Sequence, residues 1–147
     1  ETASFGRLHG LEEDAIKDRL DWLITTLSLR DYIDRPAGRL SSGQRQRISL
    51  GRALVHNPPA LVLDEPTNAL DVVGSRDLLD TLDQLRESGH AILLSTHRLH
   101  EIEHRCDRFV IIDKGHIVAA GTRDELVGDS GELEDAFFHA IEQGAHT

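Results

Sequence analysis

The sequence predicts an α/β domain in which helices flank a parallel sheet. Two short apolar runs, at residues 61–63 and 91–94, have the length and composition of strands buried on both faces. Between them, leucines recur on one face of a predicted helix at residues 73–88. A strand, a helix and a second strand at this spacing form a right-handed crossover with parallel strands. We therefore expect both strands to end at the same edge of one sheet.

An Asp-Glu pair ends the first strand. Asp64 and Glu65 follow its apolar run, Pro66 stops the strand, and a polar turn leads to a third acid, Asp71. Binding and catalytic groups of open parallel sheets lie beyond the carboxyl ends of the strands. Neighbouring strand residues point to opposite sides, so one carboxylate is expected to hold a metal through water and the other to polarise a nucleophile. A lone Asp-Glu pair, however, is more often just a solvated strand end.

The composition limits the classes of protein to consider. The 147 residues suffice for one domain with a sizeable core. A net charge of −10 argues against nucleic-acid binding, which usually needs a basic surface. The single cysteine, Cys106, excludes an internal disulfide and fits a reducing compartment. No apolar run approaches the ~20 residues of a membrane span. The absence of methionine suggests a fragment of a longer protein.

Helices are predicted before the first strand. Apolar residues from Ile16 to Leu27 recur at helical spacing, which indicates an amphipathic helix over about residues 12–29. Residues 40–47 read Leu-Ser-Ser-Gly-Gln-Arg-Gln-Arg and open a second helix, which runs to about His56.

The start of this second helix is a candidate anion site. Ser41 or Ser42 can cap it, and its free N–H groups and dipole attract an anion. A plain serine cap is the commoner explanation, but Gly43 has no side chain and lets another molecule approach the backbone closely. The arginines that follow are interpreted as a solvated face because the chain is acidic overall.

Histidines follow the second strand. The crossover would bring His97 to the sheet edge that carries the Asp-Glu pair, where an imidazole can donate a hydrogen bond to a phosphate oxygen. The spacing of His97, His100 and His104 invites a zinc interpretation, but no partner ligands of convincing spacing accompany the last two. A third strand and a hairpin at residues 108–120, a capping box at residues 122–125 and a terminal amphipathic helix complete the chain.

Four motifs together resemble the ATP-binding subunit of ABC transporters. Residues 40–44 resemble the signature motif, residues 61–65 the Walker B strand, residues 68–71 the D-loop and residues 95–97 the switch histidine. Each motif is weak alone, but the four in this order and spacing are specific, and the resemblance covers nearly the whole chain. It implies part of a P-loop NTPase (RecA-like) sheet with flanking helices, preceded by a helical subdomain and followed by a β-hairpin and a C-terminal helix.

The resemblance also implies domain divisions and residue roles. The divisions are a helical subdomain at 1–57, half of the ATPase core at 58–121 and a helical extension at 122–147. Asp64 would hold Mg²⁺, and the implied catalytic residues are Glu65, which would orient or deprotonate the attacking water, and His97, which would contact the γ-phosphate of ATP. The residues that would close over a nucleotide held by a second subunit are Ser41, Ser42, Gly43 and Gln44. Asp71 would couple the two subunits, and the reaction would be phosphoryl transfer to water.

Two features depart from the family pattern. Ser42 stands where the signature usually has glycine, and its hydroxyl would tighten or crowd the site. No Gly-x-x-x-x-Gly-Lys-Ser/Thr phosphate loop occurs in the chain, and the resemblance implies that the chain begins after the family's nucleotide-binding loops. The chain alone is therefore expected to bind ATP poorly and to hydrolyse little or none. A sheet that lacks its upstream strands would also expose an edge and favour self-association.

The implied partners are a membrane permease and a second ATP-binding subunit, at the cytoplasmic face of the membrane and without nucleic acid. The hairpin and the C-terminal segment most resemble the sodium-extrusion and multidrug-export branch, so export of Na⁺ or drugs is expected. The alternative is a non-catalytic truncated protein that acts as an interaction partner through its signature face. DNA-repair and chromosome-maintenance ATPases share two of the motifs, but the long heptad coils of those proteins are absent from this sequence.

Overall fold

The computed structural model describes residues 2–68, 70–128 and 131–144. The chain forms two compact units, Glu1–Thr96 and His97–Thr147, and each is described by itself. The expected domain divisions after residues 57 and 121 stay a prediction.

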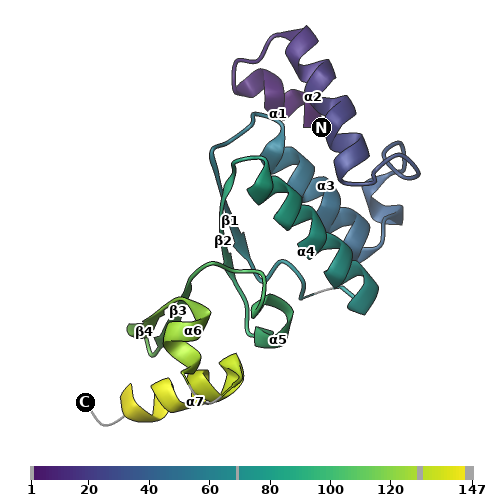
Figure 1. The fold of residues 1–147 in the computed structure, drawn as a ribbon. Coiled ribbons are helices and arrows are strands. Elements are labelled where there is room, and N and C mark those ends of the chain that lie inside the picture. The colour runs from purple at the N-terminus through teal and green to yellow at the C-terminus, as the bar shows by residue number, and fades with distance from the viewer. Residues whose placement is uncertain (1, 69, 129–130, 145–147) are drawn as a thin grey trace. The chain divides into compact units, whose positions relative to one another are not determined.

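The first unit contains the predicted helices and the parallel strand pair (Figure 1). In chain order its elements are α1 (Thr2–Leu8), α2 (Glu13–Thr26), η1 (Ala37–Arg39), α3 (Ser42–Leu54), β1 (Ala60–Asp64), α4 (Val72–Glu87) and β2 (Ala91–Ser95). Strands β1 and β2 pair in parallel, in a register that joins Ala60 to Ala91 and Asp64 to Ser95. This confirms the predicted crossover.

The sheet of the first unit has one buried and one exposed face. Leu61 is only 4% exposed, whereas Val62 is 77% exposed and its cross-strand partner Leu93 is 65% exposed. The prediction that both strands are buried on both faces is therefore wrong. The physical reason is that α3 and α4 lie on the same side of the two strands, and helices on one side cover only one face.

The core of the first unit comes from the predicted helical stripes. Buried helical side chains that are each at most 4% exposed include Ile16, Leu23, Leu27, Leu54, Leu78, Leu82 and Leu85. They come from α2, the turn that follows it, α3 and α4, so burial of this apolar surface holds these helices together.

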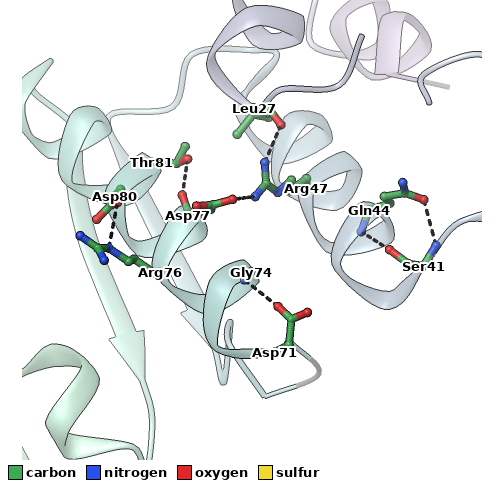
Figure 2. A network of polar contacts seen from close by, with 10 residues as sticks. All are labelled: Leu27, Ser41, Gln44, Arg47, Asp71, Gly74, Arg76, Asp77, Asp80 and Thr81. Carbon is green, nitrogen blue, oxygen red and sulfur yellow. Dashed lines mark hydrogen bonds and ion pairs between the residues drawn. The ribbon is translucent and has the colours of Figure 1, made fainter. Parts of the chain in front are cut away.

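Helix α3 is joined to α4 and to the turn before α4 at two points one helical turn apart, and Figure 2 shows the one at Arg47. The Arg47 Nη2 donates to Asp77 Oδ2 at 3.0 Å, and its Nη1 donates to the carbonyl oxygen of Leu27 at 3.4 Å. A Cβ on Gly43 would lie 3.1 Å from Leu70 Cδ2, so the start of α3 packs closely on the turn before α4. Two contacts on one face of α3 restrict both its rotation and its sliding against α4.

The second unit contains α5 (Leu99–Ile102), β3 (Phe109–Asp113), β4 (His116–Gly121), α6 (Arg123–Val127) and α7 (Leu133–Gly144). Strands β3 and β4 form the predicted antiparallel hairpin. Its turn residues Lys114 and Gly115 have φ values of 48° and 83°, the positive pair that a type I′ turn requires. The predicted capping box is also confirmed, with Thr122 and Glu125 exchanging bonds at the start of α6.

The carboxylate of Glu103 ties the start of α7 to α6. Its Oε1 accepts hydrogen bonds from Arg123 Nη2 at 2.8 Å, Arg123 Nε at 3.0 Å and the Leu133 backbone N–H at 3.1 Å. Burial acts to raise the pKa of Glu103, but the bonds from Arg123 and Leu133 outweigh it and hold the pKa below its ordinary value. The ionised carboxylate therefore stabilises the second unit.

The join between α3 and α4 predicts a measurable coupling energy. Arg47→Ala should lower the free energy of unfolding by about 1–2 kcal/mol, since it removes a partly buried ion pair and a bond to a backbone carbonyl. A double-mutant cycle of Arg47→Ala with Asp77→Ala, followed by urea unfolding, should give a coupling of about 0.5–1 kcal/mol. The more exposed pair Arg76–Asp80, at 4.0 Å, is the matched control and should give almost none. Equal coupling in both pairs would show that Arg47 does not join the helices.

The Glu103 cluster predicts acid sensitivity in the second unit. A lowered pKa in the folded state contributes stability that is fully present above the ordinary value of 4.5 and is lost as pH falls through the folded-state pKa. Thermal unfolding between about pH 6 and about pH 3 should therefore show a steeper loss of stability in the wild-type chain than in Glu103→Gln. Glu142→Gln, which changes an exposed carboxylate on α7, is the control and should keep the wild-type slope. An unchanged slope in Glu103→Gln would contradict this assignment.

Candidate functional site

The end of β1 is held by the end of β2. Asp64 and Ser95 are the last residues of their strands and are direct partners in the parallel register. The Ser95 hydroxyl donates a hydrogen bond to Asp64 Oδ1. The Asp64 side chain is exposed at the predicted edge of the sheet. The hydrogen bond from the neighbouring strand orients its carboxylate.

Glu65 turns the backbone sharply as soon as β1 ends. Its φ of 44° lies in the left-handed region, which costs a non-glycine residue about 1–2 kcal/mol. Its N–H donates to the Ser95 carbonyl oxygen at 3.0 Å and to Ser95 Oγ at 3.3 Å, and its carbonyl oxygen accepts from the Asn68 N–H at 3.1 Å. Because Glu65 lies outside the strand, strand alternation does not decide where its side chain points. Glu65 is instead partly buried, beside an exposed Asp64.

Ser41, not Ser42, caps α3. Ser41 Oγ accepts from the Gln44 N–H at 3.2 Å, and the Ser41 N–H donates to Gln44 Oε1 at 3.0 Å (Figure 2). This reciprocal capping box joins Ser41 to Gln44 and so fixes the shape of the predicted signature turn between them. The missing side chain of Gly43 also has a use within the chain, because it makes room for Leu70.

Asp71 caps α4. Its Oδ1 accepts from the Gly74 N–H at 2.7 Å (Figure 2), and the preceding Leu70 N–H donates to the Thr67 carbonyl oxygen at 3.1 Å. Ala69, part of the predicted D-loop, lies outside the described residues. The turn from β1 to α4 thus brings the Asp-Glu pair, Leu70 and Asp71 into one continuous segment, and Leu70 brings this segment against the signature turn.

His97 is the first residue of the second unit and is exposed. Within that unit it lines a pocket together with Arg98, which precedes α5, and with residues of α5 and α7: Leu99, His100, Glu134, Phe137 and Phe138. Its expected contact with a phosphate stays a prediction.

The oxygen donor at the end of β1 suits a hydrated divalent cation such as Mg²⁺. No group of three or more His, Cys, Asp or Glu side chains among the described residues is arranged to hold a metal, so a zinc cage has no support there. A single exposed carboxylate such as Asp64 suits Mg²⁺, which keeps several waters and binds through one or two carboxylates.

The sequence placed Ser95 within the switch-histidine motif but predicted no role for its side chain at the end of β1. The available signal was that β1 and β2 are predicted with similar lengths, which places the second strand's last residues beside the acids that end the first. No helix in the described parts of the chain is long and apolar enough to cross a membrane.

Comparisons with known proteins agree with this architecture. Residues 1–68 match the family model described as "ABC transporter". The chain is 36% identical to the ABC transporter ATP-binding protein NatA of Bacillus subtilis, over 89% of this chain and 53% of that protein. It is 32% identical to the linearmycin resistance ATP-binding protein LnrL of the same species, over 97% of this chain and 49% of that protein.

A solved structure of the ATP-binding subunit of an ABC transporter matches with a TM-score of 0.79 and 29% identity, over 95% of this chain and 62% of that one. The chain spans about half the length of the curated relatives that it matches. On its sequence and its fold, the chain belongs to the family of ABC transporter ATP-binding proteins.

Proposed function

We propose that this chain is part of the ATP-hydrolysing subunit of a membrane transporter. The observation that carries the proposal is the fixed pair of carboxylates at the end of β1, where Ser95 bonds to both residues. Two carboxylates in different environments suit one metal-binding role and one water-activating role. Family membership supports ATP as the substrate.

Each carboxylate has a separate task in this proposal. Mg²⁺, when bound with ATP, neutralises charge on the β- and γ-phosphates. Asp64 holds the water shell of that ion at the exposed edge of the sheet. Glu65, partly buried in its sharp turn, accepts a proton from the attacking water or orients it.

The remaining site residues act on the phosphates and on a second subunit. His97 donates a hydrogen bond to the γ-phosphate. Asp71 couples this subunit to its partner from the start of α4. The residues that close over a nucleotide held by the partner are Ser41, Ser42, Gly43 and Gln44. The capping box supports this role, because it keeps the N-terminal end of a 13-residue helix, α3, in a fixed shape for an anion.

The transporter would export its substrate through a permease, with the ATP-binding subunits on the cytoplasmic face of the membrane. One relative, LnrL, is a linearmycin resistance ATP-binding protein, which supports a drug as the substrate more directly than Na⁺. The chain alone would hydrolyse little or no ATP, because its 147 residues include no phosphate loop. A second candidate function is a non-catalytic partner that binds a complete subunit through its signature face, and the capping box of Ser41 and Gln44, which fixes the shape of that face, supports it.

The proposal predicts that activity depends on a phosphate loop supplied by another chain and on Glu65. An ATPase assay of the 147-residue chain alone should show no activity above buffer. Adding it to the amino-terminal part of an ATP-binding subunit of the family, which carries the phosphate loop that this chain lacks, should restore hydrolysis. Glu65→Gln in the chain should then lower the restored rate by about 100-fold or more, because the attacking water loses its base.

Glu87→Gln, which neutralises an exposed acid at the end of α4, is the matched control and should keep the restored rate. Restoration that is equally strong with Glu65→Gln would contradict the catalytic role and favour the non-catalytic partner. Failure of the wild-type chain to restore any activity would contradict the proposed function itself.

A further inference from the structure

The Ser95 hydroxyl lies between the two carboxylate residues of the site. It donates its proton to Asp64 Oδ1 and accepts the Glu65 backbone N–H at 3.3 Å. A serine hydroxyl has one donor and two acceptor positions, so one side chain can serve both neighbours. The backbone of the same residue adds a second bond, because its carbonyl oxygen accepts the Glu65 N–H at 3.0 Å.

We propose that Ser95 is a positioning residue that prepares Asp64 for a hydrated divalent cation and holds Glu65 in its turn. The inference rests on the proposed function, since it concerns the same metal and the same attacking water. It adds a residue to which the resemblance assigned no role.

The hydrogen bond from Ser95 gives the two oxygens of the Asp64 carboxylate different roles. With Oδ1 turned toward Ser95, Oδ2 is directed to the water shell of the cation. Carboxylates and imidazoles that serve metals are commonly oriented by such outer-shell hydrogen bonds, and loss of one typically weakens metal binding 10- to 100-fold. Ser95 reaches Asp64 from a different strand, so the orientation depends on the β1–β2 register and not on local sequence.

The bonds to Glu65 keep an unfavourable backbone conformation in place. A left-handed glutamate persists only where its surroundings hold it, and the hydroxyl and carbonyl oxygen of Ser95 both receive its N–H. Ser95 thereby sets where the Glu65 side chain leaves the backbone. Removal of the hydroxyl should disturb both carboxylates together, although only one of them binds the ion.

Two substitutions of equal shape test this role. Threonine keeps the hydroxyl of Ser95, whereas valine replaces it with a methyl group, and both suit a strand. The 147-residue chain would be titrated with Mn²⁺ alone, and broadening of the Asp64 and Glu65 amide signals would be followed by ¹H–¹⁵N NMR. The wild type and Ser95→Thr should respond at similar Mn²⁺ concentrations. Ser95→Val should need about ten times more Mn²⁺, and Asp64→Asn should remove the effect.

Ser49→Val is the matched control, because Ser49 is an exposed serine on α3, away from the strand ends. Equal Mn²⁺ responses of Ser95→Thr and Ser95→Val would overturn the proposal, as would a wild-type chain whose Asp64 and Glu65 signals are unaffected by Mn²⁺. If Ser95→Val loses its dispersed amide spectrum, Ser95→Ala replaces it in the same comparison. No nucleotide is present, so a failure here is separate from a failure of the ATPase assay.

Discussion

The parallel pairing of β1 with β2 is the constraint on which the rest of the site depends. It joins the last residue of one strand to the last residue of the other, Asp64 to Ser95. From this register follow the hydrogen bond between their side chains and the two bonds that hold the Glu65 N–H. A shift by one residue would move Ser95 to the opposite face and remove these three hydrogen bonds. The geometry of the carboxylates is thus a property of the sheet.

The same sheet edge is connected to the signature turn through the packing of α3 on α4. Leu70 lies in the turn that leaves the carboxylates and packs where Gly43 has no side chain. One helical turn further, Arg47 joins α3 to α4 and to the end of α2. In a transporter that closes two subunits over ATP, this arrangement would let the signature turn and the turn after β1 move as one body.

Much of this structure follows from local sequence. Apolar runs bounded by acids or glycine predict β1 and β2, helical periodicity predicts α2, α4 and α7, and the spacing from Thr122 to Glu125 predicts the cap of α6. The features that could not be predicted from the sequence are those that depend on tertiary structure. The exposed face with Val62 and Leu93 depends on which side the helices cover.

In the site, too, some residues are predicted by local sequence and others depend on tertiary structure. Asp64 and Glu65 were predictable because a strand end, an acid pair and a proline are consecutive in the chain. The role of Ser95 was not, because it lies 31 residues from Asp64 and only the strand register brings them together. The choice between Ser41 and Ser42 as the cap likewise depended on a side-chain geometry that either serine could have adopted.

The most direct test of this account is amide hydrogen exchange at Glu65 in the wild-type chain. Glu65 follows the end of β1, and a residue past a strand end normally exchanges quickly. Since its N–H is bonded to Ser95 on the neighbouring strand, we expect protection comparable to that of Leu63 within the strand. Exchange as fast as that of an exposed loop amide would mean that Ser95 does not hold Glu65, and the proposed basis of the site would be wrong.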